Sequence, residues 1–198
     1  MAPRLLTTEL ADLLPMKRTS GRHVSQAIYR LAVKLGHLEE RSDDNGPQMA
    51  YLQLGCTWED VMAEALAKRV ALHEPGRYIH GMEMYLDGLY GTLDILDVAD
   101  SVVEECKLTK ISSRNDIRSD KFWKWWVQVK AYCWMAGVNT GRLRVAFLNG
   151  DYAWMRGEKD NDLIHYRVWE DTWTSRELQN NWKMICNAAR ELPPEVHP

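Results

Sequence analysis

The hydrophobic pattern of the chain predicts four helical regions. From Val24 to Leu35 apolar side chains recur at the spacing of one helix face, and Gly36 marks the end of that helix. Thr172 or Thr174 is the expected N-cap of the last helix. The predicted helices cover 23–36, 48–72, 120–136 and 172–191, and the second is one long helix or two shorter ones bent near Gly55.

Strand patterns fill much of the remaining chain. Three strands are predicted close together, and Asp87-Gly88 forms a hairpin turn between the first two. Two further strands flank the turn-rich segment GDYAWMRGEKDND. The predicted strands cover 78–86, 89–97, 102–110, 142–149 and 163–170. The order of these elements is helices, an antiparallel meander, a helix, strands and a final helix. This order predicts an α/β fold with a central mixed β-sheet flanked by helices.

Length and composition fit a single globular domain. The 198 residues, with 45% hydrophobic and 27% charged side chains, are enough to bury a core. No apolar run approaches the roughly 20 residues that span a bilayer, and the N-terminus lacks a secretory pattern, so we expect no membrane contact and a cytoplasmic location. The four cysteines are widely spaced without a C-x-x-C pair, which argues against a zinc ribbon or a disulfide framework.

Charge is distributed unevenly along the chain. The net charge of −3 does not suggest a nucleic-acid-binding protein. Between Lys107 and Lys130, however, seven basic residues stand against two acidic ones. The four tryptophans of the 120–136 helix lie in the same region, and their rings could fill the core or stack on unpaired bases.

Three charged side chains are predicted to share one face of a hairpin. If residues 98–101 form the turn between the second and third strands, Asp94 lies opposite Glu105, and Lys107 lies on the same face. A slip of one residue would put Glu104 there and lose the lysine. Asp97 is interpreted as a turn former and Asp87 as part of the Asp-Gly turn.

Two hypotheses account for this cluster equally well from spacing alone. Two carboxylates so close raise each other's pKa unless a cation separates them, and hard oxygen ligands favour Mg²⁺ or Mn²⁺. A metal site beside Lys107 would suit hydrolysis of a phosphodiester bond. The alternative is a solvent-facing charged hairpin without a catalytic role.

A resemblance to a known family favours the first hypothesis. Gly91-x-x-Asp94 followed by Glu105-x-Lys107 resembles the active-site signature of PD-(D/E)XK nucleases, with Leu93 before the aspartate. The helix segment from Gln128 to Tyr132 resembles the Gln-xxx-Tyr motif of the RecB and lambda-exonuclease branch, and Gly55-Cys56-Thr57-Trp58-Glu59 resembles the upstream motif of lambda-type exonucleases.

The resemblance implies a fold and an extent. It covers about residues 50–150 and implies a restriction-endonuclease-like core. On this core a helical segment, 1–45, and a C-terminal strand and helix, 151–198, would pack within a single nuclease domain.

The resemblance also implies roles for individual residues. Asp94 and Glu105 would bind the metal together with the backbone carbonyl of Cys106, and Lys107 would position the attacking water. Glu59 would help to hold a second ion, although Glu64 competes with it for this role.

Motif residues and basic residues farther along the chain would contact the substrate. Gln128 would orient Lys107 or a phosphate, and Tyr132 would pack or contact DNA. The other expected DNA-binding residues follow the third strand: Lys110, Arg114, Arg118, Lys121, Trp123 and Lys124.

The implied function is a DNA nuclease with one or two Mg²⁺ or Mn²⁺ ions and no iron–sulfur cluster. An exonuclease of phage or recombination type, resecting double-stranded ends in the bacterial host cell, fits best. Such enzymes suggest a homo-oligomeric ring and a single-strand-annealing partner. An endonuclease on the same core, or a catalytically inactive DNA-binding or assembly protein, remains an alternative.

Overall fold

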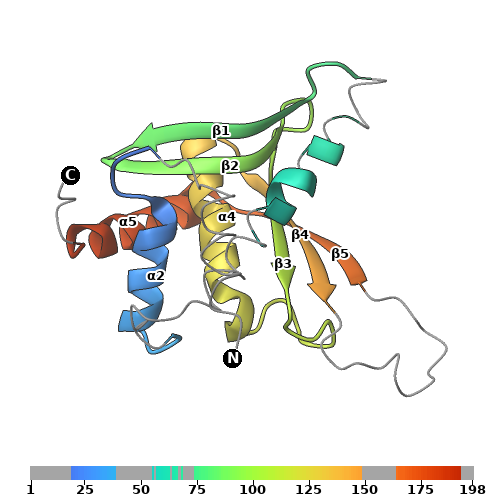
Figure 1. The fold of residues 1–198 in the computed structure, drawn as a ribbon. Coiled ribbons are helices and arrows are strands. Elements are labelled where there is room, and N and C mark those ends of the chain that lie inside the picture. Colours follow the sequence, from blue (N-terminus) through green and yellow to red (C-terminus); the bar gives the residue numbers. More distant parts are fainter. Residues whose placement is uncertain are drawn as a thin grey trace, which may run out of the picture.

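The computed structural model describes residues 19–38, 55, 57–62, 64–66, 68, 74–148 and 164–192 (Figure 1). Its labelled elements are α2 (Val24–Lys34), β1 (Tyr78–Leu86), β2 (Leu89–Asp97), β3 (Val102–Thr109), η1 (Asp120–Phe122), α4 (Trp123–Ala136), β4 (Thr140–Leu148), β5 (Ile164–Thr172) and α5 (Ser175–Arg190). Residues 55, 57–62, 64–66 and 68 are also helical and are called the Glu59 helix below. The turn-rich segment 150–162 and parts of the predicted 48–72 helix lie outside the described residues.

The five strands form one mixed sheet in the order β1-β2-β3-β4-β5. Neighbouring strands run antiparallel except β3 and β4, which are parallel. A parallel pair needs a crossover connection, and α4 provides it. The predicted α/β class with a central mixed sheet and flanking helices is confirmed.

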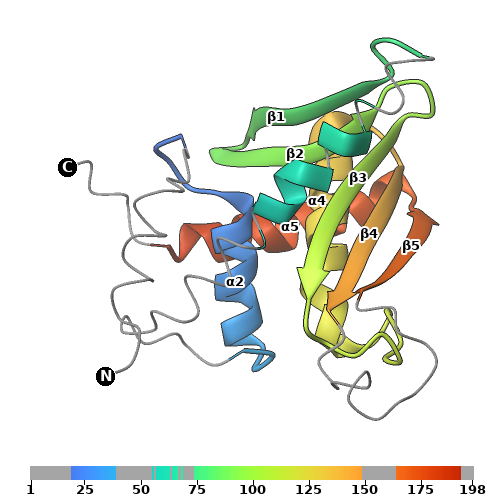
Figure 2. The same ribbon diagram turned by 45° about the vertical axis from the view of Figure 1, so that its right-hand side comes forward.

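Helices α2, α4 and α5 pack against one another on one side of the sheet (Figures 1 and 2). The main core lies between them and the strands and includes Val129, Leu143 and Trp182. Gly141 on β4 allows α4 to approach closely, because a Cβ there would lie 2.3 Å from Val129 Cγ1. The tryptophan-rich helix is therefore held tightly against the strands on either side of its crossover.

Helix ends follow local sequence signals with small shifts from the prediction. Thr174, not Thr172, caps α5: its hydroxyl accepts from the Glu177 amide, and the Glu177 carboxylate accepts from the Thr174 amide. Thr172 is the last residue of β5. Gly137 ends α4 in the left-handed conformation, with φ of 71°, which glycine adopts without steric cost.

The β1–β2 hairpin closes as predicted and then bends. Its turn residues Asp87 and Gly88 both have positive φ, 50° and 84°, as a two-residue hairpin turn requires. Farther along, the pair Gly81–Asp94 is missing from the β1–β2 ladder, and Gly81 has a φ of 62°. Such an irregularity locally re-aims side chains.

Side-chain packing changes across this irregularity. Leu93, just before it, belongs to the main core, whereas Ile95 packs in a separate small cluster with Cys106, Met62 and Leu66. The Glu59 helix contributes Met62 and Leu66 and lies beside β2 and β3 (Figure 2). Asp94 therefore lies at the point where the hairpin turns away from the rest of the sheet.

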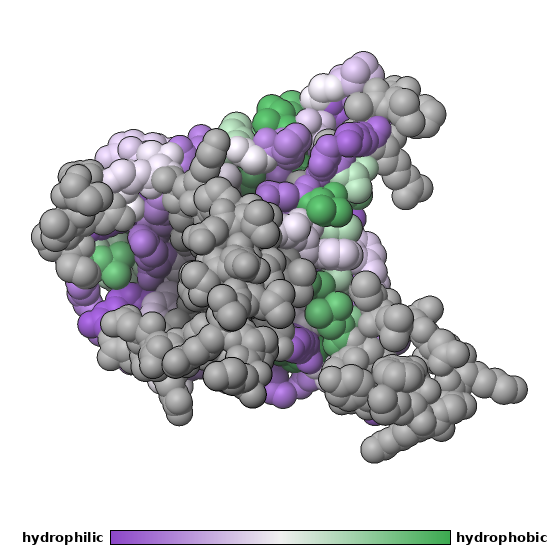
Figure 3. All heavy atoms as spheres, viewed as in Figure 1, coloured by the Kyte–Doolittle hydropathy of each residue, from purple (hydrophilic) through white to green (hydrophobic). Residues whose placement is uncertain are grey.

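The described surface is mixed in character. On the face shown in Figure 3 hydrophilic residues predominate, and hydrophobic ones gather in small separate groups. Among the helices of the described residues, none has the length and apolar content needed to cross a bilayer.

Candidate active site

Asp94 and Glu105 come together where β2 separates from β3. The β2–β3 ladder pairs Asp97 with Val102 and Ile95 with Glu104, which is the predicted register, and it ends there. Asp94, the residue before Ile95, does not form a backbone ladder pair with Glu105. Its carboxylate Oδ2 instead accepts a hydrogen bond from the Cys106 amide at 2.7 Å. The opening of the ladder frees this amide to hold the aspartate beside β3.

Lys107 joins the carboxylates of two separate elements. Its Nζ lies 2.6 Å from Glu105 Oε1 and 2.7 Å from Glu59 Oε1. The side chains are 12% exposed for Lys107, 23% for Glu59 and 0% for Glu105. Of the two candidate helix carboxylates, Glu59 thus reaches the cluster, whereas Glu64 is exposed and pairs with Lys68 on its own helix.

Burial and neighbouring charges shift the pKa values of Asp94, Glu105 and Lys107. Burial, reinforced by Glu105, raises the pKa of Asp94 well above its usual range, against the opposing effect of Lys107. Burial also raises the pKa of Glu105 to about 7, although Lys107 lowers it. For Lys107 burial acts to lower the pKa, but Glu105, Glu59 and Asp94 together raise it well above its usual value. When all of its groups are ionised, the site therefore holds more negative charge than its single lysine neutralises.

The donor set fits a divalent cation in its chemistry. Three carboxylates against one ammonium leave a surplus of two negative charges when all are ionised. Both oxygens of Glu105 are buried without a hydrogen-bond partner in the described part of the chain, and only Oε1 has the Lys107 ion pair. Oxygen ligands with unsatisfied negative charge are what Mg²⁺ and Mn²⁺ prefer.

The arrangement is not that of a ready-made metal site. Within the described residues no three His, Cys, Asp or Glu side chains are spaced to hold a metal ion. The Lys107 ammonium lies between Glu105 and Glu59, at 2.6 and 2.7 Å from their oxygens. Metal binding and the expected role of the Cys106 carbonyl both stay predictions.

Gln128 and Tyr132 of α4 contact each other. Gln128 Nε2 donates a hydrogen bond to the Tyr132 hydroxyl at 3.1 Å, and the expected contact of Gln128 with Lys107 or a phosphate stays a prediction. Tyr132 is 4% exposed and packs in the main core, which is one of the two roles expected for it, and its contact with DNA stays a prediction. A Cβ on Gly91 would lie 2.9 Å from the Tyr132 ring, so the glycine of the motif allows the tyrosine to pack against β2.

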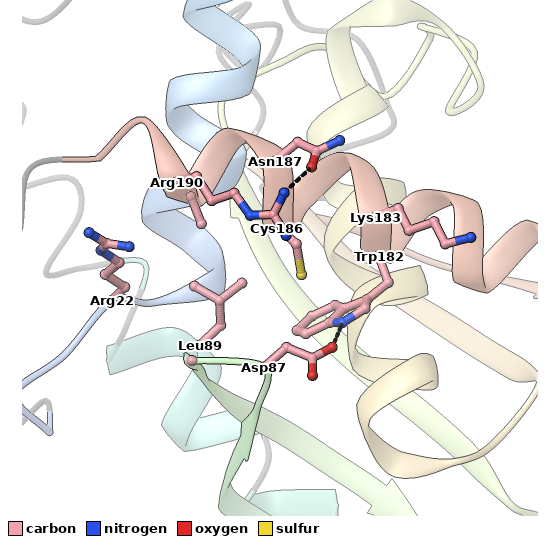
Figure 4. A pocket seen from close by; sticks show the side chains of 10 residues that line it. Arg22, Asp87, Leu89, Trp182, Lys183, Cys186, Asn187 and Arg190 are labelled. Carbon is pink, nitrogen blue, oxygen red and sulfur yellow. Dashed lines mark hydrogen bonds between the residues drawn. The ribbon is translucent and has the colours of Figure 1, made fainter.

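The remaining acidic residues of the hairpin have structural partners. Asp97 is fully buried, accepts from the Arg77 guanidinium and from the Asp100 amide, and so forms the turn as predicted. Asp87 accepts a hydrogen bond from the Trp182 indole at 2.8 Å in a separate pocket between α5 and the β1–β2 turn (Figure 4). Neither lies in the cluster of Asp94, Glu105 and Lys107.

The basic segment after β3 is ordered by its own contacts. Arg118 pairs with Asp171 at the end of β5 at 2.6 Å, and Lys121 donates to Asn115 at 2.7 Å. The Trp126 indole donates to the Ile117 carbonyl and fixes the segment to α4. Lys110 and Arg114 are exposed. Their expected contact with DNA phosphates stays a prediction.

A pocket of about 670 Å³ adjoins the cluster, and Lys107 is part of its wall. The end of β3, the following loop and the start of α4 line one side, including Thr109, Asn115 and Trp123. The region after α2 lines the other side with His37 and Leu38. The sequence did not predict this contribution, because no motif in the first 45 residues connects them to the strands.

Comparison with known proteins supports the fold and leaves the family open. No protein-family model matches the chain, and no curated protein matches it significantly. The crystal structure of SSO0001 is similar at a TM-score of 0.51 and 13% identity, over 96% of this chain and 87% of that one. A phage related exonuclease from Haemophilus somnus 129PT aligns at a TM-score of 0.45 and 10% identity, over 84% and 79%. At this level the comparison with SSO0001 shows a shared fold alone.

Proposed function

We propose that this protein is a metal-dependent DNA nuclease, an exonuclease of phage or recombination type that resects double-stranded ends in the cytoplasm. The observation that carries the proposal is the buried Glu105, which has unsatisfied oxygens and lies beside Asp94, Glu59 and Lys107. A buried carboxylate whose charge is only partly balanced is costly to a fold and is common at catalytic sites.

Each group of the cluster has a chemical task in this proposal. Asp94, Glu105 and Glu59, with the Cys106 carbonyl, would hold one or two Mg²⁺ or Mn²⁺ ions. The bound metal supplies Lewis acidity, polarising the phosphate and lowering the pKa of water. Lys107 remains protonated at neutral pH because of its raised pKa, so its ammonium can orient the attacking water and stabilise charge that develops on the phosphate.

The basic residues after β3 would guide the DNA backbone toward this cluster. Lys110 and Arg114 are exposed there, and Lys124 lines the adjoining pocket. A ring-shaped homo-oligomer and a single-strand-annealing partner belong to the same proposal, and light scattering of the purified protein would test the first.

Digestion of end-labelled linear DNA and of closed circular DNA with Mg²⁺ or Mn²⁺ tests the proposal. We expect loss of linear DNA only, and no activity in EDTA. Cleavage of circles would favour an endonuclease, and cleavage of neither substrate would favour a DNA-binding or assembly protein.

Matched variants of one helix test the site. Glu59→Ala removes a carboxylate that contacts Lys107, whereas Glu64→Ala removes an exposed one that pairs with Lys68. We expect Glu59→Ala to lower the rate and Glu64→Ala to leave it unchanged. Full activity of Glu59→Ala, or of Lys107→Ala and Asp94→Ala, would show that the cluster is not the active site.

A further inference from the structure

Strand β5 forms one edge of the sheet along its whole length. It is the last strand in the order of the sheet and lies at the end of the sheet in both views (Figures 1 and 2). On one side it pairs with β4 through nine consecutive residue pairs, and no strand of the described residues lies on the other side. Alternate residues of such a strand turn their backbone N–H and C=O groups outward, where another chain can pair with them.

The two edges of the sheet differ in how they are protected against such pairing. On β1 the ladder is interrupted at Gly81, which has a φ of 62°, and irregularities of this kind hinder edge-to-edge contact. β5 has neither an interruption nor a proline over nine residues, and an average strand has only about five or six. Tyr166 and Val168 in its middle are 44% and 42% exposed. β5 is therefore a long, regular edge with exposed apolar side chains.

Alternation along β5 divides its side chains between the two faces of the sheet. Trp169 packs against the main core on the helix side, so Arg167 points to the same face and Val168 to the opposite one. Arg167 is exposed and forms no ion pair with the described residues. The helix side of the edge thus presents a cation that has no anion beside it within the described part of the chain.

The sequence of β5 complements itself when two copies run antiparallel about Val168. Val168 is the central residue of the nine, so the two strands then overlap over their full length. Val168 lies opposite its own copy, which buries two exposed apolar side chains, and Arg167 lies opposite Trp169, where a guanidinium can stack on the indole ring. The remaining facing pairs also bring no like charges together: Tyr166 with Glu170 and His165 with Asp171.

Other registers of the same pairing are less favourable. Facing residues point to the same face of a sheet, so in a two-fold pair of identical strands the axis must pass through a residue. A centre at Arg167 or at Glu170 would place like charges opposite each other, which destabilises a strand pair. Any centre other than Val168 also leaves at least two residues of each strand without a facing residue. Charge and overlap therefore favour the same register.

We infer that β5 pairs antiparallel with β5 of a second copy of this chain about Val168 and joins two five-stranded sheets into one continuous sheet. Such a contact is isologous, because both copies use the same surface, and it closes at two copies. The ring included in the proposed function needs a heterologous contact, so this dimer is separate from it. The inference also does not depend on DNA cleavage.

Analytical ultracentrifugation of the full chain over a range of protein concentrations tests the inference. We expect a reversible equilibrium between monomer and dimer. Val168→Lys places two ammonium groups opposite each other at the axis and should raise the Kd of the dimer about tenfold or more. Ile79→Lys is the matched control, because Ile79 is also 42% exposed but lies on the other edge strand, β1. We expect Ile79→Lys to dimerise like the unaltered protein.

Disulfide formation tests the register. Val168→Cys places two thiols opposite each other, so oxidised glutathione should convert the variant to a covalent dimer. In Arg167→Cys the two thiols are offset by two residues, about 7 Å along the strand in addition to the spacing between strands, which is beyond the reach of a disulfide. We expect little covalent dimer from Arg167→Cys or from the unaltered protein, in which Cys106 and Cys133 are buried.

Three results would overturn the inference. They are a monomer at every concentration, an oligomer that Val168→Lys leaves unchanged, and cross-linking of Arg167→Cys as efficient as that of Val168→Cys. The second result would place the contact on another surface, as a ring would. Because both positions are exposed, the circular dichroism spectra of these variants should match that of the unaltered protein. DNA cleavage enters none of these measurements, so failure of the nuclease proposal would leave the dimer standing, and the reverse.

Discussion

Glu104 and Glu105 are neighbours on β3 and both are fully buried at 0% exposure, yet their side chains have opposite surroundings. Glu104 points to the sheet face away from α4 and pairs with Arg142 and Arg144 of the adjacent strand β4. Arg142 is shared with Glu170 of β5, at 2.6 Å. Glu105 faces Lys107, which it shares with Glu59, and both its oxygens lack a hydrogen bond in the described part of the chain.

The difference separates a structural carboxylate from a candidate catalytic one. Around Glu104 two guanidiniums satisfy one carboxylate, as a stable buried ion pair requires. Around Glu105 three carboxylates share one ammonium, and burial, which Lys107 only partly offsets, raises the pKa of Glu105 to about 7. Two residues that look alike in the sequence are therefore expected to respond in opposite ways to removal of their charge.

The largest expected effect is on stability at the Glu104 side. Glu104→Gln leaves Arg144 without its anion in a poorly solvated place and should lower the free energy of unfolding by about 3 kcal/mol. Glu105→Gln relieves repulsion and should leave it unchanged or raise it by about 1 kcal/mol at pH 8. Urea denaturation of both variants measures this, and equal destabilisation would remove the distinction between the two residues.

Catalysis should show the reverse order. Glu105→Gln should lower the rate of DNA cleavage by at least about 10²-fold, because several kcal/mol of transition-state stabilisation depend on the charge that it brings to the site. Glu104→Gln should retain cleavage at a temperature where it is folded. Initial rates of cleavage of linear DNA by the two variants, with folding checked by circular dichroism, measure this difference. An active Glu105→Gln protein would contradict the assignment of Glu105 to the active site.

The pH dependence of stability provides a third contrast. Glu105 has a pKa near 7 in the folded protein and about 4.3 when unfolded, so between these values the folded state binds more protons. Stability without metal should therefore fall as pH rises from about 4.5 to 7, by about 2 kcal/mol relative to Glu105→Gln. Lys107 adds no slope in this window because its pKa is raised. Parallel wild-type and Glu105→Gln curves would show that Glu105 does not titrate in this way.

Metal binding should offset the surplus negative charge around Glu105 and so stabilise the folded protein. This is the smallest of the four predicted effects. Mg²⁺ at about ten times its Kd should stabilise the protein by about 1.4 kcal/mol, or roughly 3 °C in Tm. The shift should be larger at pH 8 than at pH 6, because protons compete for the carboxylates. Differential scanning fluorimetry with Mg²⁺, then EDTA, measures it. A shift that persists in Glu105→Gln would place the ion elsewhere.

Local sequence signals were sufficient for most of the fold. The Asp87-Gly88 turn, the strand spans and the β2–β3 register follow from turn chemistry and alternation, which act over few residues. Errors were confined to element ends, such as Thr172, which extends β5 instead of capping α5. There the β-ladder with Thr140 on β4 outweighed a capping preference.

Other features depended on contacts between distant segments. Glu59, and not Glu64, reaches Lys107 because of the way the Glu59 helix lies beside β3. Residue spacing within the helix does not specify this position. The burial of Tyr132 follows from its packing against Gly91. The pocket wall formed by His37 likewise depends on where α2 ends relative to Trp123.

Residue order alone was enough to assign Asp94, Glu105 and Lys107 to one region of a hairpin, because strand alternation and a four-residue turn fix register locally. Contacts between distant segments determine that Glu104 pairs with two guanidiniums, whereas Glu105 shares a single ammonium with Glu59. The strand β4, more than 30 residues farther along the chain, pairs in parallel with β3 and places Arg142 and Arg144 beside Glu104. On the other side, Lys107 is shared by carboxylates from separate elements. Charge balance in a protein interior is set by neighbours in space, and a chain sequence lists only neighbours along the backbone.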